Sequence, residues 1–409
     1  MTEGPRKSGH PAAAGKRAEV FELARQLFPE ARQRVRVGAH GVEVVADLLM
    51  PEGDGLRLIK VQAGTRVRPR HWDDLALQVW VLRGSGLNIV RAGVLHLDRK
   101  HRHGQPSPPL FRWMERELRP DFSDERALLA DVQAAAEKPE GSFGTACRVP
   151  RPCPWWGRCH PPSLPTDIRQ VPGCAALADQ LESWGVRSVH ELDDAVRLNP
   201  LQRRAVRCLR ANEDELDPAL GPLLPDLEGA HYLDFEAWNP ALPRFANTQP
   251  YATLPVQWSL HSHEGGTLAH REWLHEDDSD PRPAFQQSLH ALREVAGPIL
   301  VWSPFEARML RSHGLMDVAS RVVDLQALMH RHYYNPGFGP TLSLKRVFSV
   351  LCPGEGYSDL DIQDGGMAAV LYQQFLDGET ALRPALLAYC ARDTWALAQV
   401  HRALVARCG

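Results

Sequence analysis

The chain has 409 residues, of which 44% are hydrophobic and 24% charged, and its formal net charge is −3. This composition is typical of a globular protein with about two or three domains. No apolar run approaches the ~20 residues that a membrane-spanning helix needs, which argues against such a helix. The small negative charge gives no support for nucleic-acid binding by the whole molecule, although local basic clusters can still supply it.

Residues 1–17 are polar and rich in Gly, Pro and Ala, and they lack the apolar core of a signal peptide. We therefore expect a disordered tail there and a cytoplasmic protein. Because that compartment is reducing, the eight cysteines are expected to be free thiols or metal ligands and not disulfides.

Residues 18–140 have the pattern of an α/β domain. A helix is expected at Arg17–Phe28, where Val20, Phe21, Ala24 and Leu27 recur at helical spacing. The elements expected after it are the strands Val35–Val37, Val42–Met50 and Leu56–Ala63, the helix Asp74–Leu82 and the strand Leu87–Leu97.

This order, with Asp47 near the end of one strand and Gln78 on the following helix, resembles the RecB/Cas4-like branch of the PD-(D/E)XK nucleases. The resemblance implies a metal-binding E-x-K motif on the intervening strand, but this chain has Lys60-Val61-Gln62 there. One carboxylate does not replace the two that a divalent-ion site of this kind uses. We expect a degenerate domain that keeps the fold and has lost the chemistry.

Residues 141–165 form a cysteine loop in which Cys147, Cys153 and Cys159 fall within thirteen residues. Closely spaced thiols with intervening Pro and Gly are typical of metal ligands. The resemblance implies an iron–sulfur cluster, which ordinarily uses four thiolates. Cys174 or His160 could supply the fourth ligand of a cluster or of a Zn²⁺ site. A loop that has lost its metal is an equally good interpretation.

Residues 161–172 are rich in proline and are interpreted as a linker, and a small helical module is expected at residues 166–222. A helix carrying Leu177 and Leu181, a stop at Gly185 and a second helix resemble the helix-hairpin-helix DNA-binding motif. The second helix is basic, with Arg203, Arg204, Arg207 and Arg210. This pattern has two interpretations: the helix contacts DNA or RNA, or it simply has a solvated face.

Residues 223–409 have a second α/β pattern, which begins with a short strand at His231–Glu236. Asp234 and Glu236 are two apart, so their side chains point to the same face of that strand. Two neighbouring carboxylates repel each other, and a Mg²⁺ or Mn²⁺ ion between them removes the repulsion. The other expected elements are the strands Pro255–His263, Thr267–His275, Pro298–Trp302 and Arg321–Leu325, and the helices Pro283–Val295, Pro304–His313, Ser343–Leu351, Met367–Leu376 and Pro384–Val405.

A three-strand meander followed by helices and further strands, with acids on the first strand, resembles the RNase H-like fold and the DnaQ-like DEDD exonucleases. The family's D-x-E motif matches Asp234 and Glu236, its second motif matches Glu306, and its Y-x3-D motif matches Tyr389 and Asp393. The resemblance implies that the four acids are catalytic ligands of two Mg²⁺ or Mn²⁺ ions, and that Tyr389 orients the attacking water.

Two positions near these motifs depart from the family or stay open. The second motif usually has Asp where this chain has Glu306, whose longer side chain could change the spacing of the metals. Asp324 is either an additional acid on the last strand or the N-cap of the following helix.

Five aromatic or basic residues between the metal motifs are candidates for substrate binding. Tyrosine rings can stack on an unpaired base, and Lys or Arg can contact a phosphate. Packing or a surface salt bridge is the alternative for each. The candidates are Arg244, Tyr251, Tyr333, Tyr334 and Lys345.

Longer stretches, among them 233–245, 249–251 and 255–261, resemble an uncharacterised bacterial family that joins a RecB-like domain, a cysteine loop and a DnaQ-like domain. The resemblance implies nuclease ancestry. We expect a two-metal-dependent 3′–5′ exonuclease that hydrolyses single-stranded DNA or RNA, with no membrane partner. The alternative is a non-catalytic nucleic-acid-binding scaffold derived from two nuclease folds.

Overall fold

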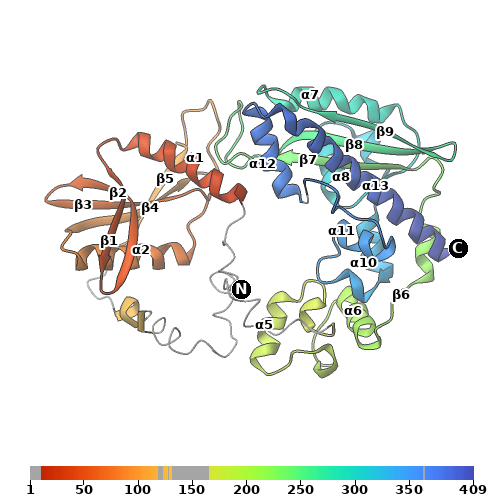
Figure 1. Cartoon of the computed structure of the whole chain (residues 1–409), viewed down its shortest axis with the longest axis horizontal. Helices are drawn as coiled ribbons and strands as arrows, with labels where there is room; N and C mark the ends of the chain where they lie inside the picture. The colour runs from red at the N-terminus through yellow and green to blue at the C-terminus, as the bar shows by residue number, and fades with distance from the viewer. Residues whose placement is uncertain (1–10, 118–122, 128, 131–164, 363) are drawn as a thin grey trace. The chain divides into compact units, whose positions relative to one another are not determined.

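The computed structural model describes residues 11–117, 123–127, 129–130, 165–362 and 364–409 (Figure 1). Contacts divide the described chain into two units. The first unit contains the described residues up to 130 together with Asn239–Thr253, and the second contains 165–238 and Leu254–Gly409. The mixture of helices and sheets in both units confirms the predicted α/β class.

The first unit is a five-stranded sheet with a helix on each face (Figure 1). The strands lie in the order β1-β2-β3-β4-β5, with β3 and β4 parallel and the other neighbours antiparallel. The sequence did not predict β5. The elements are α1 (Pro11–Leu27), β1 (Arg32–Ala39), β2 (Val42–Glu52), β3 (Gly55–Gln62), α2 (Pro69–Gly84), β4 (Ile89–Leu97) and β5 (Phe111–Glu115).

Apolar cores on both faces of the sheet hold these layers together. Consecutive strand residues enter opposite cores, as the alternation of side chains requires. Leu48 packs in the core that contains Val20 and Phe21 of α1, whereas its neighbour Leu49 packs in the core that contains Leu75 of α2. A sheet that is buried on both faces explains why β3 has little alternation between apolar and polar residues.

The segment Asn239–Thr253 completes the first unit, although the sequence placed it inside the C-terminal domain. Its residues Ala241 and Tyr251 join the core of α1. The Tyr251 hydroxyl donates to the carbonyl of Ala63 at 2.8 Å, and the carbonyl of Thr248 accepts from the His103 amide at 2.9 Å. Long-range packing of this kind leaves no local sequence signal.

The second unit is built on a five-stranded sheet in the order β11-β10-β7-β8-β9. Strands β7, β8 and β9 are successively antiparallel, and β10 and β11 run parallel to β7. The strands are β6 (Glu215–Leu216), β7 (His231–Trp238), β8 (Leu254–Glu264), β9 (Thr267–Leu274), β10 (Ile299–Val301), β11 (Val322–Asp324) and β12 (Tyr333–Tyr334), of which β6 and β12 pair separately.

The helices of the second unit cover both faces of its main sheet. The long helix α13 packs across β7 and β8, and Phe285 of α7 joins the core on the opposite face. The sequence did not predict α9 or α10. The helices are α5 (Ala175–Ser183), α6 (Pro200–Ala211), α7 (Pro281–Ser288), α8 (Pro304–Ser312), α9 (Met316–Ala319), α10 (Leu325–His332), α11 (Leu344–Leu351), α12 (Gly365–Leu376) and α13 (Arg383–Cys408).

The helical module shares its core with the main sheet of the second unit. Ala178 of α5 and Leu209 of α6 belong to the same buried cluster as Leu404 of α13. Ile168 and Val171 are also buried there, so the described end of the expected linker is packed. Composition alone does not distinguish a packed segment with a few apolar residues between prolines from a linker.

Candidate metal centre

Three carboxylates meet where α13 crosses β7. Asp234 and Glu236 come from β7, and Asp393 comes from α13. One oxygen of each lies within 4.8 Å of the others, so the group could hold a metal ion. Hard divalent cations such as Mg²⁺ and Mn²⁺ take oxygen ligands of this kind.

The alternation of β7 brings these acids to the face covered by α13. Tyr232 lies in the core beneath α13, whereas Leu233 and Phe235 lie in the opposite core. Asp234 and Glu236 share the face of Tyr232 because they follow it at steps of two. The neighbouring Cys390 of α13 directs its thiol toward the Asp234 carboxylate, with an Sγ–Oδ2 distance of 3.6 Å.

Burial and mutual repulsion both favour the protonated forms of these acids. Burial, followed by the charges of Glu236, Asp393 and Glu306, raises the pKa of Asp234 well above its usual value. Burial and Asp393 raise the pKa of Glu236 to about 8. Burial also raises the pKa of Asp393. A bound cation would remove the repulsion and release these protons.

Glu306 lies in the first turn of α8 and is 4% exposed. The hydroxyl of Ser303, the N-cap of that helix, donates to Glu306 Oε2 at 3.2 Å. Burial raises the pKa of Glu306 to about 7. Its charge acts on Asp234 and Glu236, but its oxygens lie outside the group of three. Asp324 accepts from the amide of Ala327 at 2.9 Å and caps α10, as one of its two interpretations expected.

Lys345 places a cation beside the carboxylates. Its ammonium donates to the Tyr389 hydroxyl at 3.0 Å and lies 4.5 and 4.6 Å from the ring centroids of Tyr389 and Tyr357. Burial lowers the pKa of Lys345, while the charges of Asp393, Asp364, Glu236 and Asp234 oppose that shift. The structure thus brings two predicted residues, Lys345 and Tyr389, next to the acids.

Tyr357 also belongs to this centre, and the sequence did not predict it. Its hydroxyl donates to Asp393 Oδ1 at 2.6 Å. The burial of Tyr357 and the nearby charge of Asp393 raise the pKa of the phenol above its usual value. The residue lies between α11 and α12, where no periodic pattern indicates which side chains face inward.

Tyr333 and Tyr334 do not have the exposed rings that stacking on a base needs. Both side chains are fully buried. The hydroxyl of Tyr333 donates to Asp214 at 2.8 Å, and that of Tyr334 donates to the carbonyl of Gln170 at 3.2 Å. Both residues therefore pack within the protein, as the alternative interpretation expected.

The other two substrate-binding candidates, Arg244 and Tyr251, belong to the first unit. Arg244 pairs with Glu19 at 3.7 Å, and Tyr251 packs in the core of α1. They are therefore part of a different unit from the carboxylate group.

The basic helix α6 uses its arginines within the protein. Arg204 and Arg207 both pair with Glu215. Arg210 donates to the carbonyls of Val189 and Leu192, and Arg203 donates to that of Leu198. These contacts fit the ordinary structural interpretation of the helix.

In the first unit, the position of the expected nuclease motif holds an internal ion pair. Lys60, which is 3% exposed, pairs with Asp74, and Asp47 accepts from the Val61 amide at 2.9 Å. Among the described residues, no second group of carboxylates, cysteines and histidines is close enough to hold a metal. Cys147, Cys153 and Cys159 lie outside the described residues, so the metal expected there stays a prediction.

Residues 231–343 match the model of a domain of unknown function, DUF2779. The matched region contains Asp234, Glu236 and Glu306 and ends before Lys345 and Asp393. It supports the predicted resemblance to an uncharacterised family. Comparisons with curated proteins and with solved structures gave no match. In the part of the chain that the structure describes, no helix combines the length and apolar character needed to cross a membrane.

Proposed function

We propose that the second unit is an RNase H-like DEDD nuclease, specifically a 3′–5′ exonuclease that hydrolyses phosphodiester bonds of single-stranded DNA or RNA. The observation that carries the proposal is the group formed by Asp234, Glu236 and Asp393, whose oxygens lie within 4.8 Å of one another. Three strands in an antiparallel meander and two strands parallel to the first also support it.

The donor set suits divalent cations. Asp234, Glu236 and Asp393 would hold one Mg²⁺ or Mn²⁺, and Glu306 would join them in holding a second. Such ions, when bound, supply a more acidic water and stabilise a leaving 3′ oxygen. The raised pKa values of Asp234 and Glu236 support this assignment, because they reflect burial together with negative charge on neighbouring carboxylates that nothing nearby fully balances.

Tyr389 and Lys345 would act on the substrate side of the carboxylates. Tyr389 lies one helical turn from Asp393 on the same face of α13, where its hydroxyl would orient the attacking water. Lys345 shares a hydrogen bond with that hydroxyl and would contact an oxygen of the reacting phosphate. Fixed positive charge next to the phosphate stabilises the charge that develops in the transition state.

The test is metal-dependent release of mononucleotides from a 3′-labelled single strand, with DNA and RNA assayed in parallel. Asp234→Ala should remove activity, whereas Asp317→Asn, which removes an exposed carboxylate of the same unit, should keep it. Loss of activity in Asp47→Ala instead would move the chemistry to the first unit. Nucleic-acid binding without cleavage at any metal concentration would favour the scaffold alternative.

A further inference from the structure

The first unit contains a hollow of about 510 Å³ that the proposed nuclease function does not use. This volume lies within the range of about 300–1,000 Å³ that small-molecule sites occupy. Residues from both helices and from three strands line it. They are Arg17, Ala18, Phe21, Arg34, Val45, Asp47, Lys60, Val61, Asp74 and Gln78.

The charged residues of this hollow fall into two groups. Lys60 and Asp74 pair with each other, so each already has a partner. Arg17 and Arg34 are exposed, and neither makes a hydrogen bond or an ion pair with another described residue. The remaining charge, Asp47, lies on β2 and accepts one hydrogen bond from the Val61 amide. The hollow therefore offers two guanidinium groups that are available to an anion.

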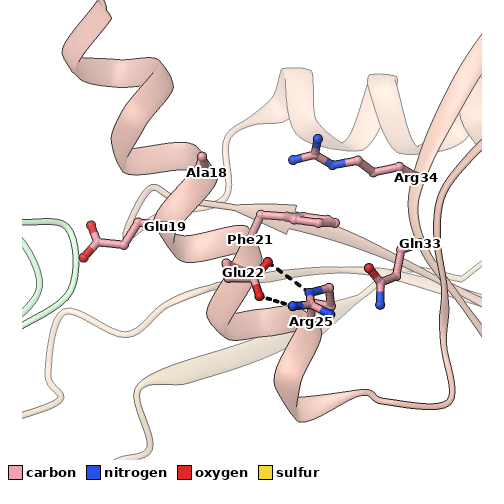
Figure 2. Close-up of a pocket in the computed structure, with 7 residues that line it drawn as sticks. All are labelled: Ala18, Glu19, Phe21, Glu22, Arg25, Gln33 and Arg34. Atoms are coloured by element: carbon pink, nitrogen blue, oxygen red, sulfur yellow. Dashed lines mark hydrogen bonds and ion pairs between the residues drawn. The ribbon is translucent and has the colours of Figure 1, made fainter.

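In a neighbouring hollow, Arg34 differs from a second arginine, Arg25, which already has a partner. Figure 2 shows Arg25 and Arg34 lining the same depression, with Arg25 paired to Glu22 and the guanidinium of Arg34 above the Phe21 ring. The Arg34 guanidinium lies 4.6 Å from the centroid of that ring. Stacking on an aromatic face holds an arginine in place while leaving its N–H groups free to donate.

Two acceptors in the hollow could bind a donor on the same ligand. The Asp47 carboxylate has capacity for hydrogen bonds beyond the one from Val61. Gln78 is 5% exposed, its amide nitrogen donates to Asp74, and its Oε1 has no hydrogen-bond partner. A buried acceptor without a partner is unfavourable, and a small rotation of this side chain would let a ligand N–H satisfy it. The hollow thus combines donors for an anion with acceptors for N–H groups.

We propose that this hollow binds a nucleotide, either free or at the end of a strand, without a divalent cation. Arg17 and Arg34 hold the phosphate, since guanidinium groups match phosphate oxygens in geometry and charge. Asp47 and Gln78 face the N–H groups of the base. The Lys60–Asp74 pair leaves no carboxylate free to join Asp47 in holding a metal ion.

The experiment measures binding of fluorescent mononucleotides and of a 5′-phosphorylated single strand to the full chain in EDTA. We expect Arg17→Gln and Arg34→Gln each to weaken binding about tenfold, the loss typical of one charge-assisted hydrogen bond. Arg25→Gln is the matched control, because it removes a nearby arginine that is already paired, and it should leave affinity unchanged. Equal weakening in all three variants would mean a diffuse electrostatic effect and would overturn the proposal.

The variant Asp47→Asn distinguishes this site from a metal-dependent one, because the two predict opposite changes in nucleotide affinity. This change keeps an acceptor oxygen for the base and removes a negative charge that repels the phosphate of the same nucleotide, so it should tighten binding in EDTA by about threefold or more. A site that needed a divalent ion would instead lose affinity in Asp47→Asn and bind nothing in EDTA. Either of those results would contradict the proposal, and neither depends on whether the second unit cleaves nucleic acids.

The choice of probes distinguishes the sources of the nucleotide. If the mononucleotide binds more strongly than the strand, the ligand of the hollow is a free nucleotide. If the 5′-phosphorylated strand binds more strongly than the same strand without the phosphate, the ligand is the end of a strand. Inorganic phosphate that competes as well as either probe would overturn the assignment of a nucleotide.

Discussion

Each unit has a half-buried aspartate on an interior strand of its sheet, but the two aspartates have different neighbours. Burial raises the pKa of both Asp47 and Asp234. Lys60 opposes the shift at Asp47, whereas Glu236, Asp393 and Glu306 increase it at Asp234. The comparison teaches that a strand acid has no chemical role by itself. The charge of the residues around it decides whether the protein already balances it or needs an external cation.

The largest effect should come from removing one member of the second-unit carboxylate group. Asp234→Asn keeps the size of the side chain and removes a metal-ligating charge, so we expect a loss in kcat of about 100- to 1,000-fold. Single-turnover cleavage at saturating Mn²⁺ measures it. A variant that cleaves at the rate of the unmodified protein would show that Asp234, like Asp47, is not needed for cleavage.

Lys345→Met tests whether the cation beside the acids acts on the substrate. It should lower kcat about 10- to 100-fold while changing Mn²⁺ affinity little, since Lys345 donates to the Tyr389 hydroxyl and, as a cation, is not a metal ligand. Measuring kcat and the Mn²⁺ dissociation constant separately checks this. A change confined to metal affinity would make Lys345 a structural counter-charge, comparable to Lys60 in the first unit.

Tyr357→Phe should weaken Mn²⁺ binding about tenfold, the lower end of the range for residues that orient a metal ligand. The hydroxyl of Tyr357 donates to Asp393 Oδ1 and stabilises its charged form. Without that hydrogen bond, Asp393 would hold its proton more tightly. Metal titration by calorimetry measures the change, and unchanged affinity would contradict this role.

The acids should also make the stability of the metal-free protein depend on pH. The pKa values of Glu236 and Glu306 are raised to about 8 and about 7, above the ordinary value of 4.5. Their contribution to stability is therefore complete below about pH 4.5 and is lost as the pH rises through 7 to 8. In EDTA, Tm should fall by several degrees over this interval.

Mn²⁺ should restore most of that loss, with the largest increase in Tm at the highest pH. Glu236→Gln should flatten the pH dependence, because a neutral amide has no proton to release. A metal-free Tm that rises between pH 6 and 8.5 would show that the carboxylates are balanced internally, as Asp47 is in part by Lys60.

The smallest effect is expected for Tyr333→Phe. This change removes a hydrogen bond between a buried phenol and Asp214, so it should lower the free energy of unfolding by about 1 kcal/mol and leave kcat unchanged. Chemical denaturation and the cleavage assay measure the two quantities. A large loss of activity with unchanged stability would return Tyr333 to the substrate-binding group.

The sequence predicted those parts of the candidate site that depend on local spacing. Asp234 and Glu236 share a strand face and Tyr389 and Asp393 share a helix face, because the periods of strands and helices fix these relations. The sequence also predicted most of the strands and helices in both units. The exact position of Glu306 depends on how α8 packs, and it lies outside the group of three acids.

Depth in the fold and long-range contacts could not be predicted in this way. Tyr333 and Tyr334 are predicted to bind substrate because they are aromatic and lie between the metal motifs, but residue type does not reveal that both are buried. Tyr357 lies in a connection without periodicity. The assignment of 239–253 to the first unit depends on contacts with residues more than a hundred positions away, such as the one between Tyr251 and Ala63.

The segment 239–253 also affects when the first unit can fold during synthesis of the chain. At about 5–20 residues per second, a ribosome needs several seconds to pass from residue 130 to residue 253. Until then Ala241 and Tyr251 are missing from the core of α1, so the first unit waits for part of the second to be synthesised. A gene fragment that stops before residue 239 therefore encodes a first unit whose core beneath α1 lacks Ala241 and Tyr251. Expression of the first unit by itself calls for supplying 239–253 as well.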